Sequence, residues 1–310
     1  MNREFFKSAG ALALSAAMLL ALAACGEPEP DPHEGMAYVN TGANWEWIYP
    51  AEGVAVSDFT QDDFTTNADG LPEYTGDAYD TRLGVDVSFY QGEIDWEAVA
   101  ADGVEFAMIR CGYRGSESGT IVVDEQFENN IEGALAAGLD VGVYFFSQAI
   151  TVEEALEEAQ FVLERVRDYD LTMPAVFDWE MVSDSSARTN AIDSDTMNEV
   201  ALAFCGAIQE AGYESMIYFN SYQGYVKYDL SKLLDHSFWF AQYQAQPSFY
   251  YDFQMWQYSS KGSVPGIQGE VDMNLYFGAL EGGERPKLPN GQEAPLDPGI
   301  NPETGRPYGY

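Results

Sequence analysis

The residues best suited to chemistry are two carboxylates, Asp178 and Glu180, at the end of the apolar segment 174–180. The composition of that segment favours a buried strand, and side chains at positions i and i+2 of a strand lie on one face. The two carboxylates are therefore expected to point to the same side, with origins about 6.6 Å apart by strand rise. One can protonate the leaving oxygen of a glycosidic bond while the other stabilises positive charge on the sugar. The alternative is an ordinary solvated strand end, so the surrounding sequence has to decide.

The elements around this segment alternate between β-type runs and helical patterns, which indicates βα units around a parallel sheet. The expected strands are residues 83–88, 105–111, 141–147, 174–180, 216–220, 238–243, 253–258 and 270–275. The expected helices are residues 96–101, 125–137, 151–167 and 196–211. Thr151 and Glu154 form a capping box, and Gly138 and Gly212 suit C-terminal caps. The late strands follow one another too closely for full helices, so we predict a barrel with complete βα units early and abbreviated ones late.

The charge balance excludes one class of partner. With 14 basic and 51 acidic residues the net charge is −37, whereas binding nucleic acid requires clustered Lys and Arg. The two histidines, His33 and His236, lack metal-ligand spacing. We therefore predict no nucleic-acid partner, no metal and no cofactor. Cys111 and Cys205 are either two buried thiols or a disulfide, and the sequence leaves both open.

The N-terminal segment predicts a lipoprotein. Basic residues precede an apolar run too short to span a bilayer comfortably, which is typical of a signal peptide over residues 1–24. Residues 22–25, Leu-Ala-Ala-Cys, resemble a lipobox, in which the cysteine is lipidated and becomes the new N-terminus. We expect a lipid anchor at Cys25, a Pro/Glu-rich tether over 25–35, and an extracytoplasmic position on the surface of a bacterium. An ordinary secretory signal with an incidental cysteine is the alternative.

Three further segments divide the rest of the chain. Residues 36–81 include Trp45 and Trp47 but show no sustained helical or strand period. We interpret them as an irregular extension on the main domain, with the aromatic residues favouring packing over a sugar platform. The catalytic barrel is expected over 82–280. Residues 281–310, of which 12 are Pro or Gly, are expected to form a disordered tail.

Several separated motifs occur in a specific joint order. They are GVDVS at 84–88, QG at 91–92, IDW at 94–96, AAGL at 136–139, GVY at 142–144, FDWE at 177–180, WFAQY at 239–243, WQY at 256–258, VPGI at 264–267 and VDMN at 271–274. Over residues 82–278 the chain thereby resembles the family 25 glycoside hydrolases, lysozymes that cut bacterial peptidoglycan. The resemblance implies an α/β fold, an irregular TIM-like (β/α) barrel with eight strands and fewer helices in its second half. It also implies cleavage of the β-1,4 bond between N-acetylmuramic acid and N-acetylglucosamine.

Carried over by position, the resemblance implies that Asp86, Asp178, Glu180 and Asp272 ring the mouth of the barrel, where active sites form. Glu180 is the expected general acid/base, with a pKa raised by crowded carboxylates and aromatic walls. Asp178 is expected to stay ionised and to assist the substrate's own acetamido group as it attacks the anomeric carbon. Asp86 and Asp272 would position Asp178 and the sugar, or simply hold strand ends. Net retention follows from the resemblance alone.

Four more residues are expected to bind substrate because they stand near strand ends in the groove. They are Tyr144, Tyr218, Tyr243 and Gln257. Aromatic faces suit the apolar faces of sugar rings, and tyrosine hydroxyls can bond sugar hydroxyls. The chain departs from the family pattern at Phe145, where a histidine is common, and at Phe89 and Tyr90, where a tryptophan is common. These departures concern substrate subsites and leave the carboxylates in place.

Two other functions fit the motif less well. A chitinase-like hydrolase of family 18 also ends its motif in Asp-x-Glu, but it needs further aspartates where this chain has Met173 and Val176. A surface lipoprotein that binds glycan without cutting it would not require all four carboxylates. The expected partners are therefore peptidoglycan glycan strands and, through the lipid, a membrane. We expect a monomer.

Overall fold

The computed structural model describes residues 31–67, 70–279, 300–301 and 306–307. The predicted signal peptide, Cys25 and most of the predicted tail lie outside these residues. At the C-terminal end, β14 (Ile300–Asn301) pairs with β15 (Arg306–Pro307). Within the described ranges, the helices are all too short or too polar to cross a membrane.

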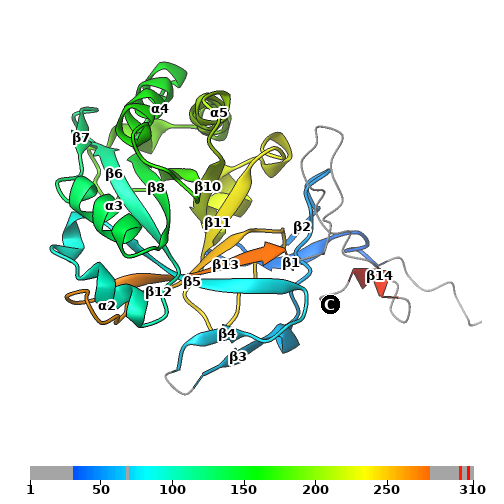
Figure 1. Cartoon of the computed structure of the whole chain (residues 1–310). Helices are drawn as coiled ribbons and strands as arrows, with labels where there is room; N and C mark the ends of the chain where they lie inside the picture. Colours follow the sequence, from blue (N-terminus) through cyan, green and yellow to red (C-terminus); the bar gives the residue numbers. More distant parts are fainter. Residues whose placement is uncertain (1–30, 68–69, 280–299, 302–305, 308–310) are drawn as a thin grey trace, which may run out of the picture.

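Eight strands close into a barrel, which confirms the predicted fold class (Figure 1). They are β5 (Tyr79–Val87), β6 (Phe106–Arg114), β8 (Asp140–Ser147), β9 (Ala175–Trp179), β10 (Ser215–Asn220), β11 (Ser237–Ala241), β12 (Met255–Gly262) and β13 (Val271–Ala279). Neighbouring strands from β5 to β12 are parallel, and β13 is antiparallel to both β12 and β5. An antiparallel last strand needs only a short connection, so no helix precedes it. Strand β7 (Ile121–Val123) pairs with the end of β6.

The α-helices are confined to the first half of the barrel, as predicted. They are α2 (Trp96–Ala101), α3 (Phe127–Ala136), α4 (Val152–Val166) and α5 (Ser194–Glu210). Shorter turns complete the path: η1 (Gln61–Asp63), η2 (Phe89–Gln91), η3 (Arg188–Ala191), the π-helical η4 (Gln223–Lys227) and η5 (Leu230–Lys232). Thr151 caps α4 by accepting from the Glu154 amide at 3.2 Å. Gly138 and Gly212 follow α3 and α5 with φ of 81° and 91°, the left-handed conformation expected of C-terminal caps.

Two apolar clusters hold the barrel. One fills its interior and includes Phe106, Met108, Val176 and Met255. The other lies between the strands and the surrounding helices, and side chains of β9 such as Phe177 belong to it. Because side chains alternate along a strand, β9 packs one face against helices and presents the other to the barrel interior.

The extension before the barrel contains two short hairpins that the sequence did not reveal, because strands of three or four residues carry too little period. One pairs β1 (Ala37–Asn40) with β2 (Trp45–Ile48), and the other pairs β3 (Phe64–Thr66) with β4 (Pro72–Tyr74). The expectation that its tryptophans pack into the protein is wrong for Trp45 and Trp47, which are 57% and 43% exposed.

Candidate active site

All eight predicted catalytic and substrate-binding residues line one cavity of about 470 Å³ at the carboxyl end of the parallel strands. Asp86 lies near the end of β5, Asp178 lies on β9, and Glu180 follows β9 directly. Asp272 is the second residue of β13, and because that strand runs backwards its beginning lies at the same end of the barrel. The antiparallel closing strand thus supplies the fourth carboxyl.

The alternation along β9 explains how Asp178 and Glu180 reach the cavity together. Val176 belongs to the barrel interior, and the residues at i+2 and i+4 continue on that face. Asp178 lies in register with Tyr218 on β10 and with Phe146 on β8, and both of these side chains also line the cavity. The chemistry-bearing residues therefore form a layer above the apolar interior.

Asp86 and Asp272 are directly opposite each other in the β5–β13 pair, where side chains share a face and lie close. Asp86 is only 5% exposed. Burial and the negative charge of Asp272 raise the pKa of Asp86 to about 8, against the opposing effect of two hydrogen bonds. These bonds come from Asn274 Nδ2 at 2.7 Å and Gln257 Nε2 at 2.9 Å, both to Asp86 Oδ2.

Two tyrosines and a tryptophan fix the amides that contact Asp86. The hydroxyls of Tyr218 and Tyr243 each donate to Gln257 Oε1 at 2.9 Å, which turns its Nε2 toward Asp86. Trp239 Nε1 donates to Asn274 Oδ1 at 2.8 Å and orients that amide in the same way. The predicted groove residues Tyr218, Tyr243 and Gln257 therefore also belong to the hydrogen-bond network around Asp86.

Glu180 and Asp178 both favour the protonated form. Burial, followed by the charge of Asp272, raises the pKa of Glu180 to about 7. The pKa of Asp178 is raised well above its ordinary value by burial, then by Glu180 and Asp86, while Arg110 acts in the opposite direction. Burial therefore does not separate the two carboxyls in the way expected from the sequence, and Arg110 is the group that favours ionised Asp178.

Arg110, on β6, is a cavity residue that the sequence reasoning missed. Its Nε donates to the fully buried carboxylate of Asp124 at 2.8 Å. The guanidinium lies 5.0 Å from the ring centre of Phe89 and 5.5 Å from that of Tyr90. Its signal was an arginine inside an otherwise apolar predicted strand, because charged side chains are seldom buried without a partner. Other lining residues not singled out as site residues are Ser88, Phe89, Tyr90, Gln91, Tyr113, Phe146 and Trp239.

The main chain at Glu180 is held by two buried glutamines. Gln148 Nε2 donates to the Glu180 carbonyl at 2.9 Å, and Gln223 Nε2 donates to the Trp179 carbonyl. The Gln148 amide is itself fixed, because its Oε1 accepts from Thr189 Oγ1 at 2.9 Å and its Nε2 also donates to the Ser147 carbonyl. Gln148 thus links the end of β8 to the residue after β9.

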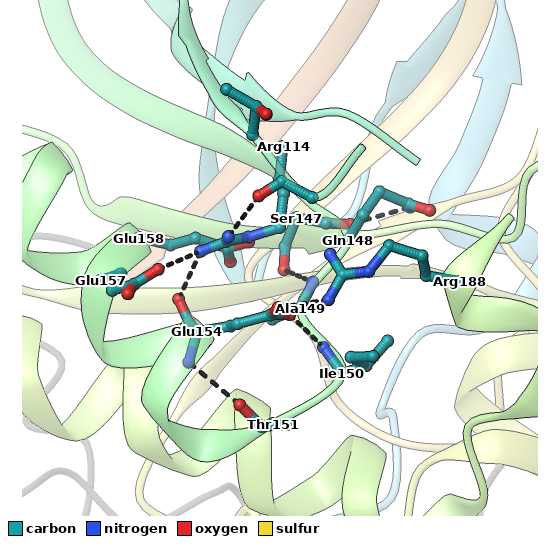
Figure 2. Close-up of polar contacts among 12 residues, drawn as sticks. Arg114, Ser147, Gln148, Ala149, Ile150, Thr151, Glu154, Glu157, Glu158 and Arg188 are labelled. Atoms are coloured by element: carbon teal, nitrogen blue, oxygen red, sulfur yellow. Dashed lines mark hydrogen bonds and ion pairs between the residues drawn. The ribbon is translucent and has the colours of Figure 1, made fainter. Parts of the chain in front are cut away.

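An ion-pair cluster supports the segment that carries Gln148 (Figure 2). Arg114, at the end of β6, donates through Nε to Glu158 Oε1 at 2.6 Å and through Nη2 to the Glu154 carbonyl at 2.9 Å. The Glu154 carboxylate accepts from the Ile150 amide at 3.0 Å and pairs with Arg188. The loop from β8 to α4 is therefore tied to β6 and to η3, which fixes the position of Gln148 next to the main chain of Glu180.

The described residues contain neither a group of metal ligands nor a disulfide. No group of three or more His, Cys, Asp or Glu side chains is arranged there to hold a metal ion. Cys111 and Cys205 are separate, buried free thiols, which decides the question that the sequence left open.

A barrel whose acidic side chains gather where the strand ends meet suits glycosidic cleavage, which uses a pair of carboxyl groups. The chain belongs to glycosyl hydrolases family 25, whose model matches residues 85–267. This confirms the family resemblance of the separated motifs.

Curated relatives and solved structures agree with this family. The autolytic lysozyme of Clostridium acetobutylicum is 27% identical over 203 residues, which cover 64% of this chain and 57% of the relative. Lysozyme M1 of Streptomyces globisporus is 27% identical over 209 residues, or 63% and 68% of the two chains. The modular autolysin LytC from Streptococcus pneumoniae matches in fold with a TM-score of 0.56 and 24% identity, covering 78% of this chain and 57% of its own. LytC has also been solved in complex with a synthetic peptidoglycan ligand.

Proposed function

We propose that this protein is a peptidoglycan hydrolase that cuts the β-1,4 bond between N-acetylmuramic acid and N-acetylglucosamine. The observation that carries the proposal is the pairing of Glu180, whose pKa is raised to about 7, with Asp178 on the same face of β9. A protonated acid beside a second carboxyl is what glycosidic cleavage requires. The two lysozymes among the relatives support the choice of substrate.

In the proposed reaction, Glu180 gives its proton to the glycosidic oxygen as the bond from that oxygen to the anomeric carbon breaks. The acetamido carbonyl oxygen of the same sugar forms a bond to that carbon. Asp178 acts in its ionised form, which Arg110 favours against the effects of burial, Glu180 and Asp86. In that form it accepts the acetamido N–H and stabilises the positive charge of the cyclic intermediate. Glu180 then takes a proton from water, whose oxygen bonds to the anomeric carbon and releases the acetamido group with net retention.

The remaining cavity residues act on Asp178 and on the sugar. Asp86 is fixed by Asn274 and Gln257, and its negative charge, when present, opposes the ionisation of Asp178. Tyr144 and Tyr218 are placed to contact the substrate by their position in the cavity wall. Burial raises the pKa of Glu180 to about 7, and the negative charge of Asp272 adds to this effect.

The decisive experiment is mass spectrometry of soluble fragments released from purified peptidoglycan by the protein and by Glu180→Gln. We expect fragments with muramic acid at the new reducing end, and a loss of about a thousandfold or more in rate for the variant, because the general acid is gone. Glu153→Gln, at an exposed position of α4, is the matched control and should keep full activity. Glucosamine at the new end would mean that the protein cuts the other bond. Retained binding without release of fragments would instead make it a glycan-binding protein.

The cellular location remains a proposal from the sequence. Cys25 is proposed as the lipidated residue that holds the protein on the outer side of a bacterial membrane. A lipid at that position would leave residues 26–35 as a spacer between the membrane and the extension.

A further inference from the structure

The β1–β2 hairpin carries a row of aromatic side chains outside the candidate active site. In this hairpin Tyr38 pairs with Trp47 and Asn40 with Trp45, so Tyr38, Trp45 and Trp47 share one face. The ring centres lie 5.3 Å apart for Trp45 and Tyr38 and 5.0 Å apart for Tyr38 and Trp47, and His33 stacks on Trp47 at 4.1 Å. We call Trp45, Tyr38, Trp47 and His33 the aromatic row.

The three larger side chains of the aromatic row are open to solvent. Trp45, Tyr38 and Trp47 are 57%, 47% and 43% exposed, whereas Ala37 and Val39 on the other face of β1 are buried. The hairpin is thus held to the protein by its small apolar face and turns its large aromatic face outward. Contiguous exposed aromatic surface of this kind marks binding sites.

A second cavity, of about 530 Å³, adjoins the row and shares Tyr38 and Trp45 with it. Its polar lining consists of Ser57, Thr60, Gln61, Gln246 and Ser248. Among the described residues, those that line this cavity include no Asp, Glu, Lys or Arg, although 51 of the 310 residues of the chain are acidic. A neutral wall of amides, hydroxyls and aromatic rings complements an uncharged, hydroxyl-rich ligand.

The second cavity is built on the same connection as the active-site groove. The segment between β11 and β12 places Tyr243 in the first cavity and residues 246–250 in the second. Main-chain contacts fix the extension to this segment: Val56 forms a β-bridge with Tyr251, and the Ser57 amide donates to the Tyr250 carbonyl at 2.9 Å. The segment between β11 and β12 therefore forms part of the wall of both cavities.

We propose that the aromatic row and the second cavity bind the glycan strand of peptidoglycan, as a holding site separate from the site of cleavage. The choice of glycan rests on the proposed function. Sugar rings stack their C–H faces on Trp45 and Tyr38, while acetamido and hydroxyl groups bond to Gln61, Gln246 and Ser248. A membrane surface fits less well, because the exposed charges beside the row, Glu34 and Glu46, are acidic.

The test uses proteins in the Glu180→Gln background, so that binding is measured without cleavage. Each is sedimented with purified insoluble peptidoglycan and, separately, titrated with an N-acetylglucosamine hexamer. Trp45→Ala combined with Trp47→Ala should weaken retention on peptidoglycan by about tenfold, the loss expected when central aromatic contacts are removed. Tyr49→Ala removes another aromatic side chain, 72% exposed, that lies outside the row, and should bind like the parent.

The activity of the same substitutions with Glu180 intact separates this inference from the proposed function. Trp45→Ala/Trp47→Ala should cut insoluble peptidoglycan more slowly and short soluble fragments at the parental rate, with an unchanged unfolding midpoint. Equal retention of the variant and its parent would overturn the holding site even if cleavage is established. Retention on anionic phospholipid vesicles that depends on the two tryptophans, without glycan binding, would overturn it in favour of a membrane contact. Because retention is measured without turnover, the binding assay tests the holding site even if the protein proves not to cleave peptidoglycan.

Discussion

Asp86 and Asp272 face each other across the β5–β13 pair. Two negative charges in directly opposite positions repel each other and are destabilising. This repulsion is useful in the proposed reaction, because the negative charge of Asp272, together with burial, raises the pKa of Asp86 and of Glu180. Burial raises the pKa of Asp272 itself to about 6, that of Glu180 reaches about 7 and that of Asp86 about 8. The proposed general acid therefore keeps its proton up to neutral pH.

Asp272→Asn should shift the basic limb of the pH dependence of kcat/KM to lower pH. The substitution removes a negative charge that raises the pKa of Glu180, so the acid loses its proton earlier as pH rises. A shift of one unit would reduce activity above the limb by about tenfold. Rates on soluble fragments between pH 4 and pH 9 measure the limb. Asp80→Asn, an exposed position of β5, should leave it in place, and an unshifted limb in Asp272→Asn would contradict the electrostatic coupling.

Strand β9 and the loop after β8 act as a unit, because Gln148 joins them through the Glu180 carbonyl. The glutamine is fully buried, and its three hydrogen bonds join it to the last residue of β8, to the residue after β9 and to Thr189 of η3. Buried amides without partners are costly, so this connection also specifies where the loop lies. Gln148 is a positioning residue: it holds the main chain from which Glu180 projects.

Gln148→Leu should lower kcat by about tenfold to a hundredfold with a smaller effect on KM, because displacing a reacting group by about 1 Å costs that much. The measurement is steady-state kinetics on soluble fragments, together with the pH profile, since displacing Glu180 also changes its electrostatic interaction with Asp272. Gln160→Leu, at an exposed position of α4, is the matched control. Equal losses of folded protein and activity, with unchanged kinetics per folded molecule, would assign Gln148 a purely structural role.

The order and type of the barrel elements could be predicted because each carries a local signal. The β9 segment shows an apolar run, and α3 and α5 end at glycines that adopt positive φ. Pairings between distant residues have no local signal, so the contacts of Arg110 with Asp124 and of Gln148 with Glu180 were not foreseen. Asp178 and Glu180 could be predicted from the strand pattern, the four groove residues from their positions near strand ends, and the other two carboxyls from the family resemblance. The aromatic row, in an extension outside the family match, could be recognised only from its exposure.

The whole molecule combines a net charge of −37 with several buried carboxyls that favour protonation. Besides the cavity residues, burial raises the pKa of Glu158 to about 7. In the unfolded chain these groups titrate near their ordinary values of about 4. The folded state therefore binds more protons than the unfolded state between about pH 4 and pH 8, and stability must fall as pH rises through that range.

The unfolding midpoint should accordingly be higher at pH 5 than at pH 8, and each kcal/mol of lost stability should lower it by about 2–4 °C in a domain of this size. Self-repulsion among surface carboxylates acts in the same direction. Calorimetry at fixed ionic strength gives the comparison. Asp86→Asn, which removes the group with pKa of about 8, should flatten the dependence between pH 6 and pH 8, and a midpoint that rises with pH would refute the account.

The antiparallel closing strand also determines when the cavity comes into being. Asp86 is made early in synthesis, but the residues opposite and beside it, Asp272 and Asn274, belong to β13, the last strand of the barrel. Pairing β5 with β13 joins segments almost 190 residues apart in sequence, and contacts of such separation form late in folding. A nascent or truncated chain therefore holds Asp178 and Glu180 without the framework around them. A protein proposed to cut cell walls would thus remain inert during its own synthesis, and become competent only when the chain has passed β13.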